Sequence, residues 1–171
     1  QLLGCKVAVV SLVDRDRQWF KAKCGLEASE TPREISFCAH AVAANDVLVV
    51  PDAMADRRFA QNPLVTSAPN IRFYAGVPIR AGMNSDTSRR MPMGTLCVID
   101  DEPREFGPDE IRCLGELANL VEALLEARHL AATAIRLADE RGSAVRKLDR
   151  MNRKLHQAER MANVGSWRLT L

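Results

Sequence analysis

Two residue types that commonly carry chemistry, Cys38 and His40, lie close together in an apolar stretch of the sequence. A thiol and an imidazole can act as a nucleophilic pair, or bind one metal ion, when both reach the same point. Ser36 can cap a helix over residues 37–44, and residues two apart on a helix point about 200° away from each other. We therefore expect Cys38 to be a small buried apolar residue and His40 to be a hydrogen-bonded structural residue, with ligand contact as the alternative.

A second group of polar residues flanks an irregular segment at 52–71. Arg72 and Tyr74 begin an apolar run, and strand alternation places both on one face and Phe73 on the other. Arg72 could bind an anion and Tyr74 could stack on a ligand, but we favour an ion pair between Arg72 and Asp52 or Asp56 that ties the segment down. The candidate ligand-binding residues are Cys38, His40, Asp52, Arg72 and Tyr74.

The sequence lacks the motifs of several enzyme classes. It contains no phosphate-binding GxxxxGK loop, no HExxH metal motif and no nucleophile elbow. We therefore predict no catalytic residue and no metal site in this chain, and the sequence does not identify a cofactor. The five cysteines show no CxxC spacing, which is typical of a reducing compartment and predicts a cytoplasmic protein. A net charge of +2 argues against a nucleic-acid partner, and no apolar run reaches the roughly 20 residues of a membrane span.

Apolar, β-branched runs separated by polar turns predict the elements that position these residues. Residues 27–34 are expected to form a polar loop, residues 83–90 a polar tip, and residues 52–71 a partly helical excursion over one face of a sheet. The result is an α+β fold with a mainly antiparallel sheet, five strands by this count, and helices packed on it. The expected strands span 6–13, 18–24, 47–50, 72–80 and 93–100.

A long helix is predicted from Pro108, with acidic residues in its first turn, to residue 161, a length of about 80 Å. Apolar or small residues recur at alternating steps of three and four, which is the spacing of a coiled coil. The seam is weak because Arg128 and Asn152 fall on it, and its phase shifts near Gly142. We predict a parallel homodimer through this helix, and the alternative is a solvated, frayed helix.

Most of the chain resembles the GAF domain family, the small-molecule sensor modules of bacterial signalling proteins. The resemblance implies a GAF/PAS-like antiparallel sheet of five to six strands, with a pocket between one face and the excursion at 52–71. The family's usual first helix would lie before Gln1. The matching residues are Ser11-Leu12-Val13-Asp14, Gln18-Trp19-Phe20, Ser36-Phe37-Cys38-Ala39-His40, Val49-Val50-Pro51-Asp52-Ala53, Asp56-Arg57-Arg58-Phe59, Arg72-Phe73-Tyr74-Ala75-Gly76 and Gly94-Thr95-Leu96-Cys97-Val98-Ile99-Asp100.

The sequence departs from three functional subgroups of the family. In bilin-binding relatives a Cys followed directly by His holds the chromophore, whereas Ala39 separates Cys38 from His40 here. The Asn-Lys…Phe…Asp-Glu signature of cyclic-nucleotide GAF domains is missing. Some relatives reduce free methionine sulfoxide with cysteines around the pocket, but the excursion at 52–71 contains no Cys. Without a resolving thiol near Cys38 the thiol–disulfide cycle does not close, so we do not expect this activity.

The last residues, from Ala158 to Leu169, resemble the opening of a PAS domain. We divide the chain into a GAF-like sensor domain at 1–127, a helical coiled-coil linker at 128–160 and the start of a PAS-like domain at 161–171. Chains of this organisation usually end in a histidine kinase or a diguanylate cyclase. We predict a sensory module that binds a small ligand and relays its state through the dimeric helix. The alternatives are a ligand-free dimerisation scaffold and a redox enzyme that acts on free methionine sulfoxide.

Overall fold

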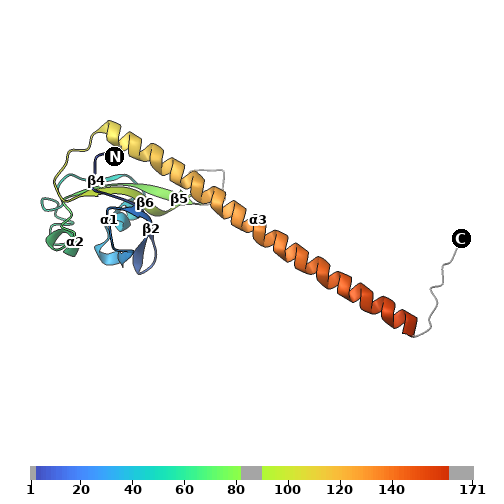
Figure 1. Cartoon of the computed structure of the whole chain (residues 1–171). Coiled ribbons are helices and arrows are strands. Elements are labelled where there is room, and N and C mark those ends of the chain that lie inside the picture. Colours follow the sequence, from blue (N-terminus) through green and yellow to red (C-terminus); the bar gives the residue numbers. More distant parts are fainter. Residues whose placement is uncertain (1–2, 82–89, 162–171) are drawn as a thin grey trace. The chain divides into compact units, whose positions relative to one another are not determined.

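The computed structural model describes residues 3–81 and 90–161, whose strands form one antiparallel sheet in the order β3-β2-β1-β6-β5-β4 (Figure 1). This arrangement confirms the predicted α+β fold. The helical segments are η1 (Arg33–Ile35), α1 (Phe37–Ala44), α2 (Pro63–Thr66) and α3 (Pro108–Met161). The strands are β1 (Val7–Val13), β2 (Arg17–Cys24), β3 (Glu30–Pro32), β4 (Leu48–Val50), β5 (Phe73–Ala81) and β6 (Met91–Asp100).

Strand β3 corrects the prediction of a polar loop at 27–34. It has three residues and pairs with β2 at the edge of the sheet, where Arg17 Nη1 donates to Glu30 Oε2 over 2.5 Å. Three residues are too few to show the alternation that identifies a strand in sequence. The predicted polar tip at 83–90 lies, apart from Arg90, outside the described residues.

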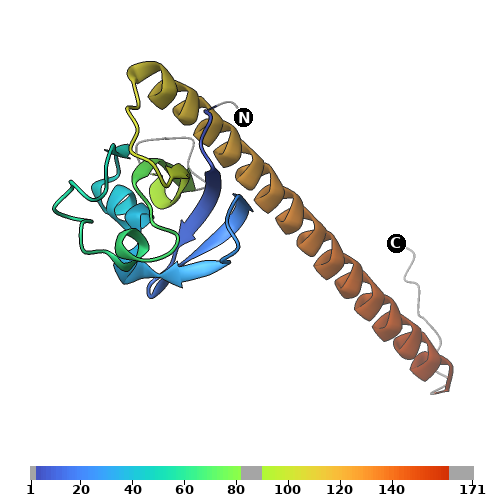
Figure 2. The same cartoon turned by 60° about the vertical axis from the view of Figure 1, so that its left-hand side comes forward.

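The central strands β5 and β6 bury side chains on both faces of the sheet. On one face Phe73, Ala75 and Val98 pack with Leu114 and Ala118 of α3. On the other face Tyr74 and Cys97 pack with residues of α1 and of the excursion at 52–71. Figures 1 and 2 show this layering, with the first turns of α3 over one face and α1 and α2 over the other.

The first turns of α3 are fixed by caps and by polar contacts to the sheet. Glu110 Oε2 accepts the Gly107 N–H over 2.9 Å, so the helix begins at Pro108 as predicted. Glu122 accepts the Arg80 N–H over 2.7 Å, and Arg90 lies 3.5 Å from Glu126. These contacts hold the start of the helix against β5 and β6.

The rest of α3, from Ala127, forms a separate unit that consists of helix as far as Met161. No residue between 127 and 161 is buried, and the exposed side chains include Ile135, Leu148 and Leu155 of the predicted seam. Across the described residues, no helix combines the length and the apolar character that crossing a bilayer requires.

The close approach of β6 to β1 predicts a strong effect of one substitution. A Cβ atom on Gly94 would lie 1.9 Å from the Ser11 carbonyl oxygen, because Gly94 lies opposite Leu12 in the sheet. We expect Gly94→Ala to lower the free energy of unfolding by about 1–3 kcal/mol in urea denaturation. The matched control is Gly115→Ala in α3, where a Cβ meets nothing within 4 Å. This change should raise stability by about 0.5–1 kcal/mol, and equal effects of the two substitutions would contradict the register.

Candidate functional site

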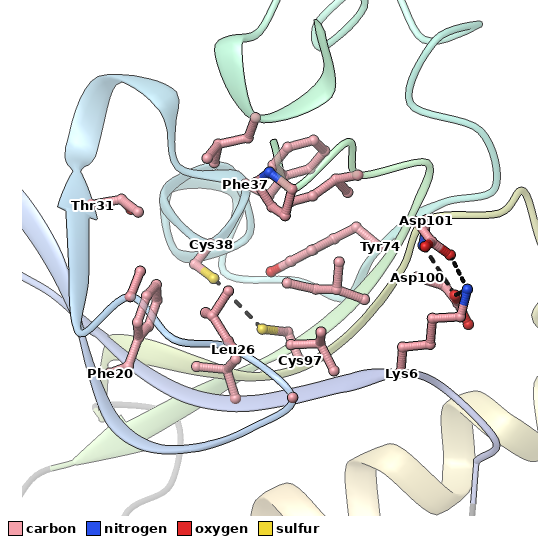
Figure 3. A pocket seen from close by; sticks show the side chains of 18 of the residues that line it. Lys6, Phe20, Leu26, Thr31, Phe37, Cys38, Tyr74, Cys97, Asp100 and Asp101 are labelled. Carbon is pink, nitrogen blue, oxygen red and sulfur yellow. Dashed lines mark hydrogen bonds and ion pairs between the residues drawn. The ribbon is translucent and has the colours of Figure 1, made fainter. Parts of the chain in front are cut away.

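A cavity of about 350 Å³ lies between the sheet and the excursion at 52–71, as the resemblance predicted (Figure 3). Strands β1, β2, β5 and β6 form its floor, and α1 and the segment around α2 form its opposite wall. Most of its lining is apolar, which is typical of small-molecule sites. The apolar side chains that line it include Val7, Val9, Phe20, Leu26, Phe37, Leu64, Ile71, Tyr74 and Ile99.

Two thiols meet at the floor of this cavity. Cys38 of α1 and Cys97 of β6 are both buried, and their Sγ atoms are 3.8 Å apart. Beside them Ser11 and Thr95, both fully buried, share a hydrogen bond of 3.2 Å between their hydroxyl oxygens. The pair lies 59 positions apart in the chain, so only the fold brings it together.

The position of Cys38 is set by the hydrogen bonds that begin α1. Ser36 Oγ accepts the Ala39 N–H over 3.0 Å, as the sequence predicted, and donates to Gln18 Oε1. Gln18 Nε2 then donates to Thr31 Oγ1 over 2.7 Å, which joins the helix start to β2 and β3. Cys38 is therefore the second residue of a well-anchored helix, where the macrodipole favours negative charge.

The two thiols are inequivalent. The hydrogen bond from Cys97 lowers the pKa of Cys38, and Ser11, Thr95 and Tyr74 lower it further, while burial opposes them. The same hydrogen bond, together with burial, raises the pKa of Cys97 well above its ordinary value. Cys38 is thus the more acidic thiol of the pair.

Tyr74 carries a buried hydroxyl that makes no hydrogen bond to any described residue. Figure 3 shows this hydroxyl pointing toward Cys38. The ring lies over Gly76, where a Cβ atom would come within 2.1 Å of the hydroxyl oxygen, and it packs against Phe37 with ring centroids 5.2 Å apart. Burial is the main cause that raises the pKa of Tyr74, so the phenol stays neutral and can donate a hydrogen bond.

Charged residues gather at the other end of the cavity, a feature that the sequence did not single out. Lys6 forms an ion pair with Asp101 and lies 3.9 Å from Asp100, whose side chain is buried (Figure 3). Its hydrogen bond to Asp101 raises the pKa of Lys6, and the same bond lowers the pKa of Asp101. The cavity therefore has a thiol end and a charged end.

Of the five predicted site residues, Cys38 and Tyr74 line the cavity and the other three lie elsewhere. Arg72 Nε and Nη2 donate to the two carboxylate oxygens of Asp52, each over 3.0 Å, which confirms the favoured structural interpretation. This contact lowers the pKa of Asp52. Phe73 faces the opposite side of the sheet from Tyr74, as predicted.

His40 does not make the hydrogen bond that we expected. Its side chain is exposed and its ring meets Phe59 edge-on, with ring centroids 4.9 Å apart, and no hydrogen bond joins it to another described residue. The reason is that α1 directs this residue outward, on the side away from Cys38. Within residues 3–81 and 90–161, no three His, Cys, Asp or Glu side chains come together as a metal site.

Cys97 is a candidate site residue that the sequence analysis did not identify. A second thiol was expected only in the excursion at 52–71, which has no Cys, whereas the thiol that meets Cys38 comes from β6. Alternation along β6 places Cys97 on the same face as Thr95, which was a usable signal. The premise that no thiol lies near Cys38 is therefore wrong.

Comparison with known proteins identifies the family to which this fold belongs. The family model of the GAF domain matches residues 1–125. The chain is 44% identical over 118 residues to a cyclic di-GMP phosphodiesterase of Pseudomonas aeruginosa, a match that covers 68% of this chain and 19% of that protein. The chain thus spans about one fifth of the length of this curated relative.

Two solved structures are similar in fold. Free methionine-R-sulfoxide reductase from Neisseria meningitidis, in complex with its substrate, superimposes with a TM-score of 0.58 and 25% identity, over 75% of this chain and 71% of that one. The GAF domain of an Acinetobacter phosphoenolpyruvate-protein phosphotransferase gives a TM-score of 0.58 and 18% identity, over 77% of each chain. The second likeness concerns the fold alone.

The unpaired Tyr74 hydroxyl predicts an unusual response to its removal. A buried hydroxyl without a partner costs about 1–3 kcal/mol, so Tyr74→Phe should raise the free energy of unfolding of the ligand-free chain by roughly that amount. Urea denaturation measures the change. The matched control is Thr95→Val, which leaves Ser11 without its partner and should lower stability. A loss of stability in Tyr74→Phe would mean that the hydroxyl is satisfied in the free protein.

Proposed function

The chain belongs to the GAF domain family, and we propose that it is the sensory module of a longer signalling protein, which binds a small ligand in the cavity. The observation that carries this proposal is Tyr74, which lines the cavity and whose buried hydroxyl has no hydrogen-bond partner among the described residues. Folded proteins rarely leave such a group unpaired. A ligand with a carbonyl oxygen or a ring nitrogen would accept its hydrogen bond and offset its burial.

The cavity favours a small and largely apolar ligand. Its volume of about 350 Å³ is at the lower end of the range for ligand sites. Lys6 is the single basic residue among the described residues that line it, and Asp101 and Asp100 already neutralise this residue. A cyclic dinucleotide with two phosphates would lack the cations that usually bind it. The ligand is therefore distinct from the nucleotide on which the Pseudomonas relative acts.

We further propose that α3 carries the state of the cavity to a following domain. The exposed seam residues Ile135, Leu148 and Leu155 support a parallel homodimer, because such side chains are usually covered by a partner helix. The compact unit that ends at Glu126 supports a sensor domain at 1–127 and a coiled-coil linker at 128–160, with a PAS-like start at 161–171. All but the first residue of that last segment lie outside the described residues.

The output of the full protein is proposed from its relatives. The sequence organisation suggested a histidine kinase or a diguanylate cyclase. Similarity to a cyclic di-GMP phosphodiesterase, at 44% identity, supports an output in cyclic di-GMP turnover over a histidine kinase. The cavity would then regulate an enzyme that is not contained in residues 1–171.

Reduction of free methionine sulfoxide is a second candidate, favoured by one specific observation. Cys97 supplies the second thiol beside Cys38, and the Neisseria reductase is 25% identical. Turnover of methionine sulfoxide by the wild-type chain, lost in Cys38→Ser, would establish this activity. A rate that is absent or indifferent to Cys38 would remove it.

Native mass spectrometry of the freshly purified chain, with a reducing agent present, tests the sensory proposal. We expect a dimer that carries one extra small-molecule mass per subunit, because the cavity and the seam both need a partner. Leu148→Ser with Leu155→Ser should give a monomer that keeps the small molecule, since these residues lie outside the sensor unit.

The matched control for the seam is the pair Arg150→Ser and Gln157→Ser, which lie on the opposite side of the helix from Leu148 and Leu155 and should leave the dimer intact. An apo dimer with no extra mass would instead favour the dimerisation scaffold. A wild-type monomer would contradict the proposed relay through paired helices.

A further inference from the structure

We propose that Cys38 and Cys97 form a peroxide-reactive dithiol site, which a small hydroperoxide converts to an intramolecular disulfide at the floor of the cavity. This proposal goes beyond ligand sensing and does not depend on the identity of the ligand. It starts from the geometry of the two sulfurs, 3.8 Å apart, on two elements that pack against each other.

The sulfurs are placed for bond formation. A disulfide bond has a length of about 2.05 Å, so the two atoms need to approach each other by a little less than 2 Å, a shift within reach of side-chain rotation. Among the described residues, no other two thiols are joined by a contact of this kind. Cys24 is exposed, and Cys5 contacts Arg104.

The two thiols have the division of roles that a disulfide-forming pair requires. Cys38 lies in the first turn of α1, beside Ser11, Thr95 and Cys97, which lower its pKa, so we assign it as the attacking thiol. Cys97, whose pKa is raised by burial and by its contact with Cys38, lies on the central strand β6, where it can act as the resolving thiol. Thiolate character together with an adjacent thiol is the usual setting of a peroxide-sensitive cysteine.

The cavity provides the path to the sulfurs. Both cysteines line it, together with apolar side chains such as Phe20 and Leu26 (Figure 3). A small neutral molecule such as hydrogen peroxide can enter without losing ionic solvation. The charged end of the cavity and its limited volume disfavour a large anionic oxidant such as a peptide disulfide.

The chemistry balances with the hydroperoxide as the only co-reactant. The Cys38 thiolate attacks one peroxide oxygen and breaks the O–O bond, which forms a Cys38 sulfenic acid, and the departing alkoxide or hydroxide takes up one proton. Cys97 Sγ then attacks Cys38 Sγ, the S–S bond forms, and the released hydroxide takes the Cys97 proton to give water. The two thiols lose two electrons, and the peroxide gains them.

The product would change the floor of the cavity directly. A disulfide ties α1 to β6 and removes the negative charge that the Tyr74 hydroxyl faces (Figure 3). The neighbouring β6 residues Leu96 and Val98 face α3 on the opposite side of the sheet. The redox state of the pair would therefore be felt at the ligand site and at the surface on which α3 packs.

Intact-mass analysis of the whole chain after brief treatment with hydrogen peroxide tests the proposal. We expect a loss of about 2 Da, reversed by dithiothreitol, and a peptide map without reductant that joins Cys38 to Cys97. Cys97→Ser should instead trap Cys38 as a sulfenic acid, a gain of about 16 Da that dimedone captures. Cys38→Ser should slow peroxide consumption by about tenfold or more.

The matched control is Cys24→Ser, which removes the exposed thiol and should leave both the disulfide and its rate unchanged. The wild-type peptide map needs no variant, so a folding defect in a variant cannot hide the result. Oxidation at Cys24 with Cys38 still reduced, or a disulfide that pairs other cysteines, would overturn the proposal. Ligand retention is measured under reducing conditions, so failure of one proposal is distinguishable from failure of the other.

Discussion

The double-sided burial of the β5–β6 hairpin is the constraint on which the rest of the structure depends. Successive residues of a strand point to opposite faces. Phe73 and Val98 therefore meet α3, while Tyr74 and Cys97 form the floor of the cavity. A slip of one residue between these strands would exchange the two sets and destroy both the site and the surface for the helix. Gly94 lets β6 lie against β1, and Gly76 leaves room for the Tyr74 ring.

Several polar groups are buried on and beside this hairpin, where water is scarce. Ser11 and Thr95 pair with each other, the Cys38 and Cys97 sulfurs contact each other, and the Tyr74 hydroxyl alone has no partner among the described residues. Hydrogen bonds are stronger in such a low-dielectric setting, and a polar group that is buried there without a partner lowers the stability of the fold. The excursion that covers the cavity is held separately, by the bidentate contact of Arg72 with Asp52. The excursion at 52–71 and the floor of the cavity are thus stabilised by different interactions.

Sequence patterns predicted the parts of this structure that depend on neighbours in the chain. Alternation identified the long strands, Ser36 identified the start of α1, and Pro108 identified the start of α3. Strand β3 was missed because three residues carry no period. The Asp52–Arg72 pair was predictable because both residues flank the same excursion.

The missed parts of the site depend on contacts between distant segments. Cys97 reaches Cys38 only through the packing of α1 on β6, and Lys6 meets Asp100 and Asp101 only because β1 pairs with β6. His40 was wrongly given a hydrogen bond because a helical position alone does not say what surrounds the side chain. The same limit applies to Tyr74, whose lack of a partner is a property of the packed cavity.

Hydrogen–deuterium exchange over residues 111–122 tests most directly whether the cavity floor and the surface for α3 are one mechanical unit. Tyr74→Leu alters the floor on β5, whereas Leu64→Ala alters the wall contributed by α2. When the two variants are compared in urea at equal global stability, exchange in α3 should be faster in Tyr74→Leu and should match the wild type in Leu64→Ala. Equal exchange in both variants would contradict the coupling of cavity and helix through the central hairpin.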